Sequence, residues 1–248
     1  SDLLFPIDVP TGHHTVSFTA TGTSSYINVN PGGNVANEYS EFDNIVVKQE
    51  DSPRDYSADI KGSGTNKTFT ANGNAGVNYE IPSYYGSTIT FDGSGDYFSS
   101  TYNADFNMGT SDFTIELWVN PDTVDSIDGL FAVSGGGGSN PKIVVHLDNG
   151  VPKVHFGHLP GSSNIYVNSA ISIPANQWSH LAFERTGSKA TWYVNGVASG
   201  IDSALSQDVT FTDQQSYIGY GGEGFFNSFD GYIQDLRVYK GVAKYKGG

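Results

Sequence analysis

Hydrophobic and polar residues alternate along most of this chain, with a repeat of two residues. That repeat is typical of a β-strand with one buried face, because successive side chains point to opposite faces of a sheet. In the segment 113–119, the side chains of Phe113, Ile115, Leu117 and Val119 fall on one face, which we expect to lie in the core. No apolar stripe with a helical period continues over the length of a typical helix. The pattern predicts an all-β fold.

The expected strands share this alternation and are separated by turn residues. They are residues 14–20, 26–30, 42–48, 88–91, 113–119, 143–147, 153–156, 178–185, 190–194, 216–220 and 231–239. Two Asn-Gly pairs, Asn149-Gly150 and Asn195-Gly196, follow alternating runs. An Asn-Gly pair between alternating runs is a strong signal for a hairpin, so we expect residues 143–147 and 153–156 to form a β-hairpin around Asn149-Gly150. By the same logic we expect residues 178–185 and 190–194, which are followed by Asn195-Gly196, to form a second one.

A polar stretch, residues 49–59, divides the chain into two blocks. The first block, residues 1–50, holds three of the expected strands, and so few strands bury too little apolar surface to be stable alone. We expect it to be an accessory β block that packs on the second block or on a neighbouring chain. The second block, residues 55–245, holds the remaining strands and is long enough for one large β-sandwich.

The composition supports this interpretation and excludes several classes of partner. The chain has 31 Gly, 15 Tyr and 15 Phe, which suit turns and pleated surfaces. Its 26 acidic and 12 basic side chains give a net charge of −14, which repels nucleic acid and anionic membranes. The absence of Cys excludes disulfides, zinc fingers and thiol catalysis. The sequence predicts neither a signal peptide nor a membrane span.

Six segments of the second block succeed one another in an order and with gaps that are shared by a known family. They are FDGSGDYF from Phe91, FTIELWVNP from Phe113, QWSHLAFERTG from Gln177, TWYVNG from Thr191, YIGY from Tyr217 and FDGYIQDLRVYKGVAKY from Phe229. Together they resemble the laminin-G-like module of the concanavalin A-like lectin and glucanase superfamily. The resemblance covers residues 55–245 and implies an antiparallel β-sandwich of the jelly-roll type, with carbohydrate as the expected ligand.

Both blocks also resemble parts of large structural proteins of marine tailed bacteriophages. The LRVYKGVAKY run at the end of the chain is similar to repeated modules of those proteins. The first block resembles the closing strands of a carbohydrate-binding jelly roll, with Asp43-Asn44 before the final hydrophobic strand. This resemblance implies a piece of a tail fibre or virion surface protein, located on the phage particle or outside the cell. Its expected partners are host-surface glycans or other virion chains, and fibre proteins suggest a homo-oligomer by analogy.

Catalysis would require a pair of carboxylates for nucleophile and acid, as in the retaining glucanases that share this sandwich. The strand 113–119 offers Glu116 alone, and one carboxylate cannot take both roles. We expect His146 and His155 to face each other across the hairpin at Asn149-Gly150, and without a third ligand we interpret them as a packed polar pair. The sequence therefore predicts a binding module that is not an enzyme.

Calcium is the expected cofactor, in a structural role, because Asp residues next to Gly offer carboxylate and carbonyl oxygens. By the resemblance, Asp235 occupies the place of a calcium-binding Asp in the last strand, unless it merely accepts hydrogen bonds from the backbone or Arg237. Asp92, Asp96 and Asp230 are weaker candidates. Asp43 is a parallel candidate in the first block.

Sugars are bound by aromatic rings that stack on their C–H faces and by polar side chains that pair with their hydroxyls, mostly from loops. The candidate contacts are Asn140, His158, Tyr166, Tyr220, Glu223, Phe225 and Phe226. Phe225 and Phe226 lie among glycines, so they either anchor a ligand or pack on a neighbouring domain or protomer. The leading hypothesis is a glycan-binding adhesion module for host recognition, and the alternatives are a structural spacer without a ligand and a glycan-cleaving depolymerase.

Overall fold

A computed structural model describes residues 64–65, 67–79, 87–135, 141–157, 159, 164–212, 214–222 and 224–245. The chain divides into two units, Ser1–Pro53 and Arg54–Gly248. The first unit, with the strands expected at 14–20, 26–30 and 42–48, lies outside the described residues. The expected division into domains therefore stays a prediction, and the described fold is that of the second unit.

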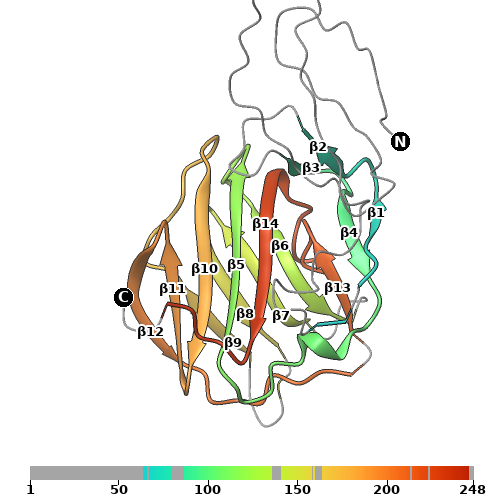
Figure 1. The fold of residues 1–248 in the computed structure, drawn as a ribbon. Coiled ribbons are helices and arrows are strands. Elements are labelled where there is room, and N and C mark those ends of the chain that lie inside the picture. The colour runs from blue at the N-terminus through green and yellow to red at the C-terminus, as the bar shows by residue number, and fades with distance from the viewer. Residues whose placement is uncertain are drawn as a thin grey trace, which may run out of the picture. The chain divides into compact units, whose positions relative to one another are not determined.

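The described residues form two antiparallel sheets that pack face to face (Figure 1). The front sheet has the strand order β12-β11-β10-β5-β14-β3-β2, and the back sheet has the order β1-β4-β13-β6-β7-β8-β9. The front sheet comprises β2 (Gly76–Asn78), β3 (Thr88–Asp92), β5 (Phe113–Pro121), β10 (Ser179–Thr186), β11 (Lys189–Val194), β12 (Val197–Ala204) and β14 (Asp230–Lys240). The back sheet comprises β1 (Thr70–Asn72), β4 (Tyr97–Ser100), β6 (Ile127–Ser134), β7 (Pro141–Asp148), β8 (Val151–Phe156), β9 (Ile165–Asn168) and β13 (Gln215–Ile218). One short 3-10 helix, η1 (Ala104–Phe106), follows β4. The predicted all-β antiparallel sandwich is confirmed.

The core fills the space between the inner faces of the two sheets. Phe113, Ile115, Leu117 and Val119 on β5 are buried there, as the alternation predicted. Trp192 on β11 is fully buried and donates its indole N–H to the carbonyl of Val167 on β9, at 2.9 Å. That hydrogen bond satisfies a buried donor and connects the front sheet to the back sheet.

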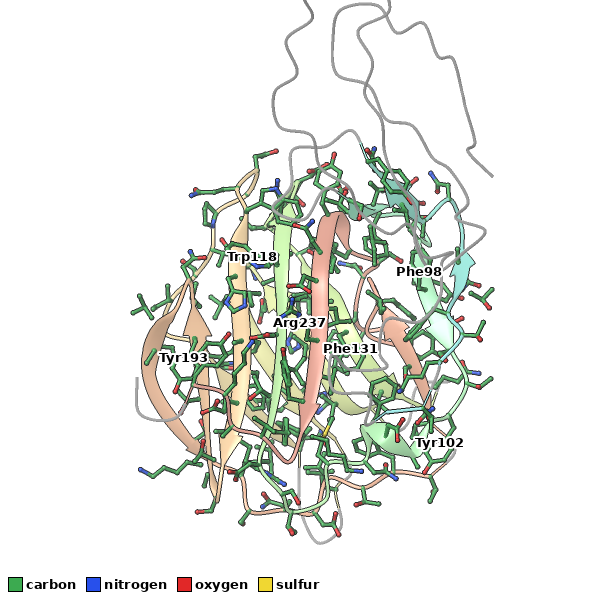
Figure 2. The ribbon with its side chains drawn as sticks, in the orientation of Figure 1. Phe98, Tyr102, Trp118, Phe131, Tyr193 and Arg237 are labelled. Atoms are coloured by element: carbon green, nitrogen blue, oxygen red, sulfur yellow. The ribbon has the colours of Figure 1, made fainter. Side chains whose placement is uncertain are left out.

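Alternation also separates core side chains from surface side chains in the front sheet. Trp118, Tyr193 and Arg237 project from its outer face, toward the viewer in Figure 2. Phe131 of the back sheet, in contrast, belongs to the core. The outer face of each sheet is therefore the place where a ligand can be contacted.

Both expected hairpins form, because β7 pairs with β8 and β10 pairs with β11, each in the antiparallel sense. Asn149 and Gly150 have φ angles of 50° and 75°, and Asn195 and Gly196 have φ angles of 51° and 79°. Two successive residues with positive φ make the type of turn whose twist matches that of the flanking strands. The first pair joins β7 to β8, and the second joins β11 to β12.

Candidate functional site

Aromatic side chains cover much of the outer face of the back sheet. We name this surface the aromatic face; it consists of Tyr97, His146, His155, Tyr166, Tyr217, Tyr220, Phe225 and Phe226. Strand register places a row of its side chains on the same side. Across the sheet, Tyr217 pairs with Ala132, Ala132 with Val144, Val144 with His155, and His155 with Tyr166.

Three tyrosines form one end of the aromatic face. The ring of Tyr97 lies 5.9 Å from that of Tyr217 and 5.4 Å from that of Tyr220, and the rings of Tyr217 and Tyr220 lie 5.8 Å apart. The hydroxyl of Tyr217 donates to Gln215 Oε1 at 2.6 Å. Burial raises the pKa of Tyr217, so it stays a neutral hydrogen-bonding group.

The loop between β13 and β14 lays its aromatic residues onto the middle of the face. Phe226 is 4% exposed, and its ring packs edge-on against His146 at 5.0 Å. Phe225 packs edge-on against Phe226 at 5.2 Å but is itself 69% exposed. The loop approaches so closely that a Cβ at Gly129 would overlap the backbone of Gly221, so this packing needs glycine.

The two histidines are part of this packed surface. His155 stacks flat on Tyr166, with ring centroids 4.4 Å apart and an interplanar angle of 6°. His146 pairs with Lys153, two residues from His155 along β8, so the two imidazoles are diagonal neighbours on one face. Burial lowers the pKa of His146 to about 4, which leaves its ring neutral at pH 7.

The structure therefore brings together four of the seven predicted ligand contacts. Tyr220, Phe225 and Phe226 share one loop, and Tyr166 lies on the same outer face. Asn140, His158 and Glu223 lie outside the described residues. Sequence reasoning missed Tyr97 and Tyr217, because their proximity to the loop depends on β4 and β13 being neighbours in the sheet.

A second cluster lies on the front sheet and contains three of the predicted metal ligands. Asp92, Asp96 and Asp230 line an open pocket of about 370 Å³, together with Asp122 and Tyr232. The remaining lining residues are Asn74, Asn78, Thr90 and Phe91. No pattern in the sequence pointed to Asp122, which reaches this place because its amide N–H donates to the carbonyl of Asp230 at 3.0 Å.

The carboxylates of this acidic pocket have different environments. Asp96 accepts hydrogen bonds from the backbone N–H groups of Asn74 and Asp92, at 2.7 and 3.0 Å. A backbone hydrogen bond from Ser94 lowers the pKa of Asp92. Asp230 pairs with Asp92 across β14 and β3, and its pKa is raised by burial and by the charges of Asp122 and Asp92.

Asp235, the strongest calcium candidate by resemblance, lies away from this pocket. It sits in a β-bulge between Gln234 and Arg237 with a φ of 54°, and its Oδ1 accepts a hydrogen bond from Arg237 Nε at 2.7 Å. Asp43 lies outside the described residues. Within the part of the chain that the structure describes, no three His, Asp or Glu side chains are grouped as a metal site would require. Calcium stays a prediction.

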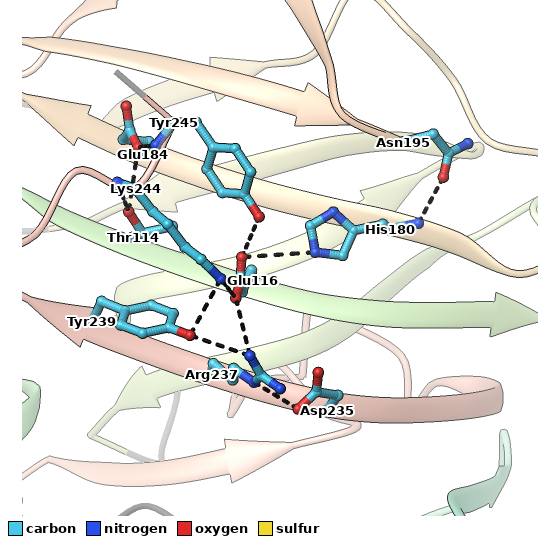
Figure 3. A network of polar contacts seen from close by, with 10 residues as sticks. All are labelled: Thr114, Glu116, His180, Glu184, Asn195, Asp235, Arg237, Tyr239, Lys244 and Tyr245. Atoms are coloured by element: carbon cyan, nitrogen blue, oxygen red, sulfur yellow. Dashed lines mark hydrogen bonds and ion pairs between the residues drawn. The ribbon is translucent and has the colours of Figure 1, made fainter. Parts of the chain in front are cut away.

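Glu116, the carboxylate considered for catalysis, is buried in a polar network on the outer face of the front sheet (Figure 3). Lys244 Nζ lies 2.5 Å from its Oε1, the hydroxyl of Tyr245 donates to its Oε2, and His180 Nε2 lies 3.7 Å away. Burial alone would raise the pKa of Glu116, but the hydrogen bonds from Lys244 and Tyr245 outweigh it and lower the pKa. Glu116 is an ionised carboxylate that is already bound by its neighbours.

The segment Val242–Tyr245 covers a second carboxylate of the same face. Glu184 is 2% exposed, and its Oε2 accepts a hydrogen bond from the backbone N–H of Tyr245 at 2.5 Å. Thr114 between them donates to the carbonyl of Val242 at 2.9 Å. Glu116 and Glu184 are thus held under the C-terminal segment and do not line an open cleft.

Comparisons with known proteins identify the fold. A family model described as the concanavalin A-like lectin/glucanases superfamily matches residues 92–244. A search of curated protein sequences gives no match. Among the described residues, no helix has the length and hydrophobicity that crossing a membrane requires.

Solved structures with the same fold include a domain of an arabinanase and binding domains of two toxins. One is domain 4 of AbnA, an arabinanase from Geobacillus stearothermophilus, in complex with arabinotriose (TM-score 0.57, 19% identity, 76% of this chain and 89% of that one). Another is the binding domain of Paraclostridial Mosquitocidal Protein 1 (TM-score 0.57, 14% identity, 73% and 45%). A third is the ligand binding domain of botulinum neurotoxin serotype D, in complex with N-acetylneuraminic acid (TM-score 0.51, 12% identity, 72% and 44%). This chain matches less than half the length of the two toxin structures, and these similarities show the fold alone.

Proposed function

Because the chain belongs to the concanavalin A-like lectin/glucanases superfamily, we propose that it is a non-catalytic module that binds glycans through the aromatic face. The family match confirms the resemblance drawn from the six sequence segments. The observation that carries the proposal is the exposure of Tyr166 and Phe225, at 55% and 69%, on a surface of packed aromatic rings.

Exposed rings on a rigid base suit the recognition of sugars. A sugar presents a C–H face that stacks on an aromatic ring and hydroxyl groups that need hydrogen-bonding partners. Tyr166 offers such a ring, and Asn168, two residues further along β9, is an exposed polar side chain. Gln215 on β13 is another exposed polar side chain of the back sheet. Large exposed hydrophobic residues that cluster on one surface are typical of an interaction site.

The structural neighbours support a sugar as the ligand. The AbnA domain and the neurotoxin domain were both solved with bound carbohydrate, and each has this sandwich fold. The sequence resemblance to bacteriophage fibre proteins extends the proposal to a place on a virion and to glycans of a host surface. The net charge of −14 opposes binding to polyanions, so a host glycan without charge is the better candidate.

Hydrolysis is a second candidate function, favoured by one observation. Asp92 and Asp230 are cross-strand partners in an open pocket, and the pKa of Asp92 is lowered while that of Asp230 is raised. Two carboxylates with separated pKa values are what a glycosidase needs for its nucleophile and its acid. Glu116 and Glu184 do not add to this candidate, because both are buried under the C-terminal segment.

A glycan array followed by calorimetric titration tests the proposed function. We expect saturable binding to at least one glycan, and we expect Tyr166→Ala and Phe225→Ala each to weaken it about tenfold or more without lowering Tm. Tyr79→Ala is the matched control, because Tyr79 is 60% exposed but lies outside the aromatic face. An absence of saturable binding would favour the structural spacer instead.

The same glycans also decide between binding and cleavage. Incubation with the protein, followed by chromatography of the products, is expected to leave their chain length unchanged. Shortened products that disappear with Asp230→Asn or Asp92→Asn would establish the hydrolase and overturn the non-catalytic assignment.

A further inference from the structure

The aromatic face offers two exposed rings that lie on different elements. Tyr166 is on β9, at one edge of the back sheet, and Phe225 is on the loop between β13 and β14. These are the two large aromatic side chains of the surface that are more than half exposed. Each ring can therefore contact a ligand without moving other groups.

Each exposed ring is supported by a buried ring. Tyr166 stacks on His155, which is 6% exposed, so one side of the tyrosine ring is covered and the other is open. Phe225 packs against Phe226, which is 4% exposed and packs in turn against His146. Because the supports are buried, the two exposed rings are held in place before a ligand arrives, which lowers the entropic cost of binding.

The strand order sets how far apart the two exposed rings are seated across the back sheet. Tyr166 pairs with His155 on β8, and His155 pairs with Val144 on β7, which belongs to the cluster that holds Phe226. Neighbouring strands lie about 4.8 Å apart, so Tyr166 on β9 is roughly 10 Å across the sheet from β7, on which Phe226, the support of Phe225, packs through His146. Two further strand spacings, through β6, lead to Tyr217 on β13, roughly 19 Å from Tyr166.

A single sugar ring cannot contact both exposed aromatic rings over that distance. From this spacing we infer that the aromatic face binds an internal stretch of a neutral glycan chain, several sugar units long, that runs across the strands of the back sheet. The inference rests on the proposed function and adds the class of ligand. A terminal monosaccharide would use one of the two rings and leave the other without a contact.

The charges on the face agree with a neutral ligand. Lys153 is engaged by Asp148 in an ion pair of 2.6 Å, with each side chain about one quarter exposed. His146 is neutral at pH 7, since burial lowers its pKa to about 4. No cation of the described part of this face is therefore available to balance a carboxylate, sulfate or phosphate group on a sugar.

Affinity as a function of chain length tests the inference. The probes are the mono-, tri- and hexasaccharides of the arabino, xylo, cello and manno series, titrated calorimetrically against the full chain. In the series that binds, we expect the hexasaccharide to bind at least about tenfold more tightly than the monosaccharide, which corresponds to about 1.4 kcal/mol. Tyr166→Ala and Phe225→Ala should each remove most of that gain, whereas Tyr79→Ala should retain it.

The outcomes separate the inference from the proposed function. Equal affinity for the monosaccharide and the hexasaccharide, still lost in Tyr166→Ala or Phe225→Ala, would overturn the inference and leave glycan binding at this face intact. Tight binding of a sialylated or sulfated probe in preference to all neutral ones would also overturn it. Failure of every array glycan and every probe to bind would overturn the proposed function itself. Tyr166→Leu provides a second variant that removes the ring and keeps an apolar side chain.

Discussion

At the scale of single residues, the acidic pocket holds charges that repel one another. Asp230 faces Asp92 across two strands, and like charges directly opposite each other destabilise a sheet. Because the folded state raises the pKa of Asp230, folding takes up protons there. Burial of the carboxylate is the largest cause of the raised pKa, and the charges of Asp122 and Asp92 add to it. This cost is fully present above the folded-state pKa and disappears below the unfolded value of 3.8, so this group makes stability fall as the pH rises through that window.

Asp230→Asn is predicted to stabilise the protein at pH 7, because an amide retains the shape of the side chain and removes its charge. At a pH below 3.8 the difference from the wild-type chain should vanish, since the carboxyl group is then neutral in both states. Thermal unfolding at neutral and at acidic pH measures both effects. The exposed Asp208, whose carboxylate accepts a hydrogen bond from Thr210, gives Asp208→Asn as the control. A lower Tm for Asp230→Asn at pH 7 would contradict the prediction.

A calcium ion bound in the acidic pocket would reverse the destabilising effect of the Asp230 charge. A divalent cation between the carboxylates would turn their repulsion into a favourable interaction, and a ligand that binds only the folded state raises Tm. We expect added Ca²⁺ to raise the Tm of the wild-type protein and to have no effect on Asp230→Asn. Asp235→Asn should respond like the wild type, because Asp235 is paired with Arg237. A loss of the response in Asp235→Asn alone would instead support the site expected from the sequence.

Asp105 makes an opposite contribution to stability. Burial would raise its pKa, but hydrogen bonds from Thr65 and Lys67 and the charge of Lys67 lower it to about 2. Lys67 is almost fully buried and donates to Asp105 Oδ2 at 3.1 Å. A depressed carboxyl pKa contributes stability that is present above the unfolded value of 3.8 and is lost as the pH falls toward 2.

The predicted measurement is urea unfolding of the wild type and Asp105→Asn between pH 2 and pH 5. The wild type should be the more stable protein above pH 4, and the difference should shrink steadily as the pH approaches 2. Asp208→Asn serves again as the control. A difference that stays constant down to pH 2 would mean that Asp105 acts through shape and hydrogen bonding instead of through its charge.

At the scale of elements, one buried side chain connects β10 to the segments that flank the core. Arg185 is fully buried, and it donates to the carbonyls of Gly109, Ser111 and Gln207. Its guanidinium also lies 5.1 Å from the ring of Phe113. A planar group with five donors can serve carbonyls in several directions at once, which Lys cannot do.

Arg185→Leu is predicted to destabilise the protein by roughly 3 kcal/mol or more. It removes the guanidinium donors from the carbonyls of Ser111 and Gln207, and one of two donors from the carbonyl of Gly109, which keeps its hydrogen bond from the backbone N–H of Val209. Urea unfolding at pH 7 measures the loss. Arg185→Lys should recover only a part of it, whereas Lys240→Ala, at an exposed position on β14, should change little. If Arg185→Leu were as stable as the wild type, water would have to satisfy the carbonyls of Ser111 and Gln207.

The sequence predicted most of the long strands that alternate and missed several others, including β4, β9 and β12. β5, β10, β11 and β14 were expected within one or two residues of their observed bounds, and β14 extends by one residue at each end. β6 was missed because seven of its eight residues are buried, so no alternation marks it. β1 and β2 have three residues each, too few for a repeat to be recognised.

Some residues of the candidate site were also missed from the sequence, for a different reason. Phe225 and Phe226 were found because aromatic residues among glycines are unusual in a loop. Tyr97 and Tyr217 come from strands far apart in the chain, and no local pattern indicates that β4 and β13 are neighbours. A sequence reports which residues share a strand face, but the order of strands depends on contacts over long separations.

At the scale of the whole molecule, the fold and the candidate site share one part of the chain. Both sheets, the core and the aromatic face consist of residues between Gly64 and Tyr245. Large β-sandwiches of this length are stable as single domains, because their two inner faces bury each other. The described sheets, the core and the face proposed to bind glycans therefore all lie in the unit Arg54–Gly248.

A fragment of residues 54–248 is predicted to fold cooperatively and to bind the same glycans as the full chain. Its circular dichroism melt should show one sharp transition, and its affinity in calorimetric titration should stay within about twofold of that of residues 1–248, since the strands that carry Tyr166 and the loop that carries Phe225 are unchanged. Tyr166→Ala in the fragment is the matched control and should lose affinity as it does in the full chain. A fragment that folds but no longer binds would place essential contacts in residues 1–53 and move the functional site away from the aromatic face.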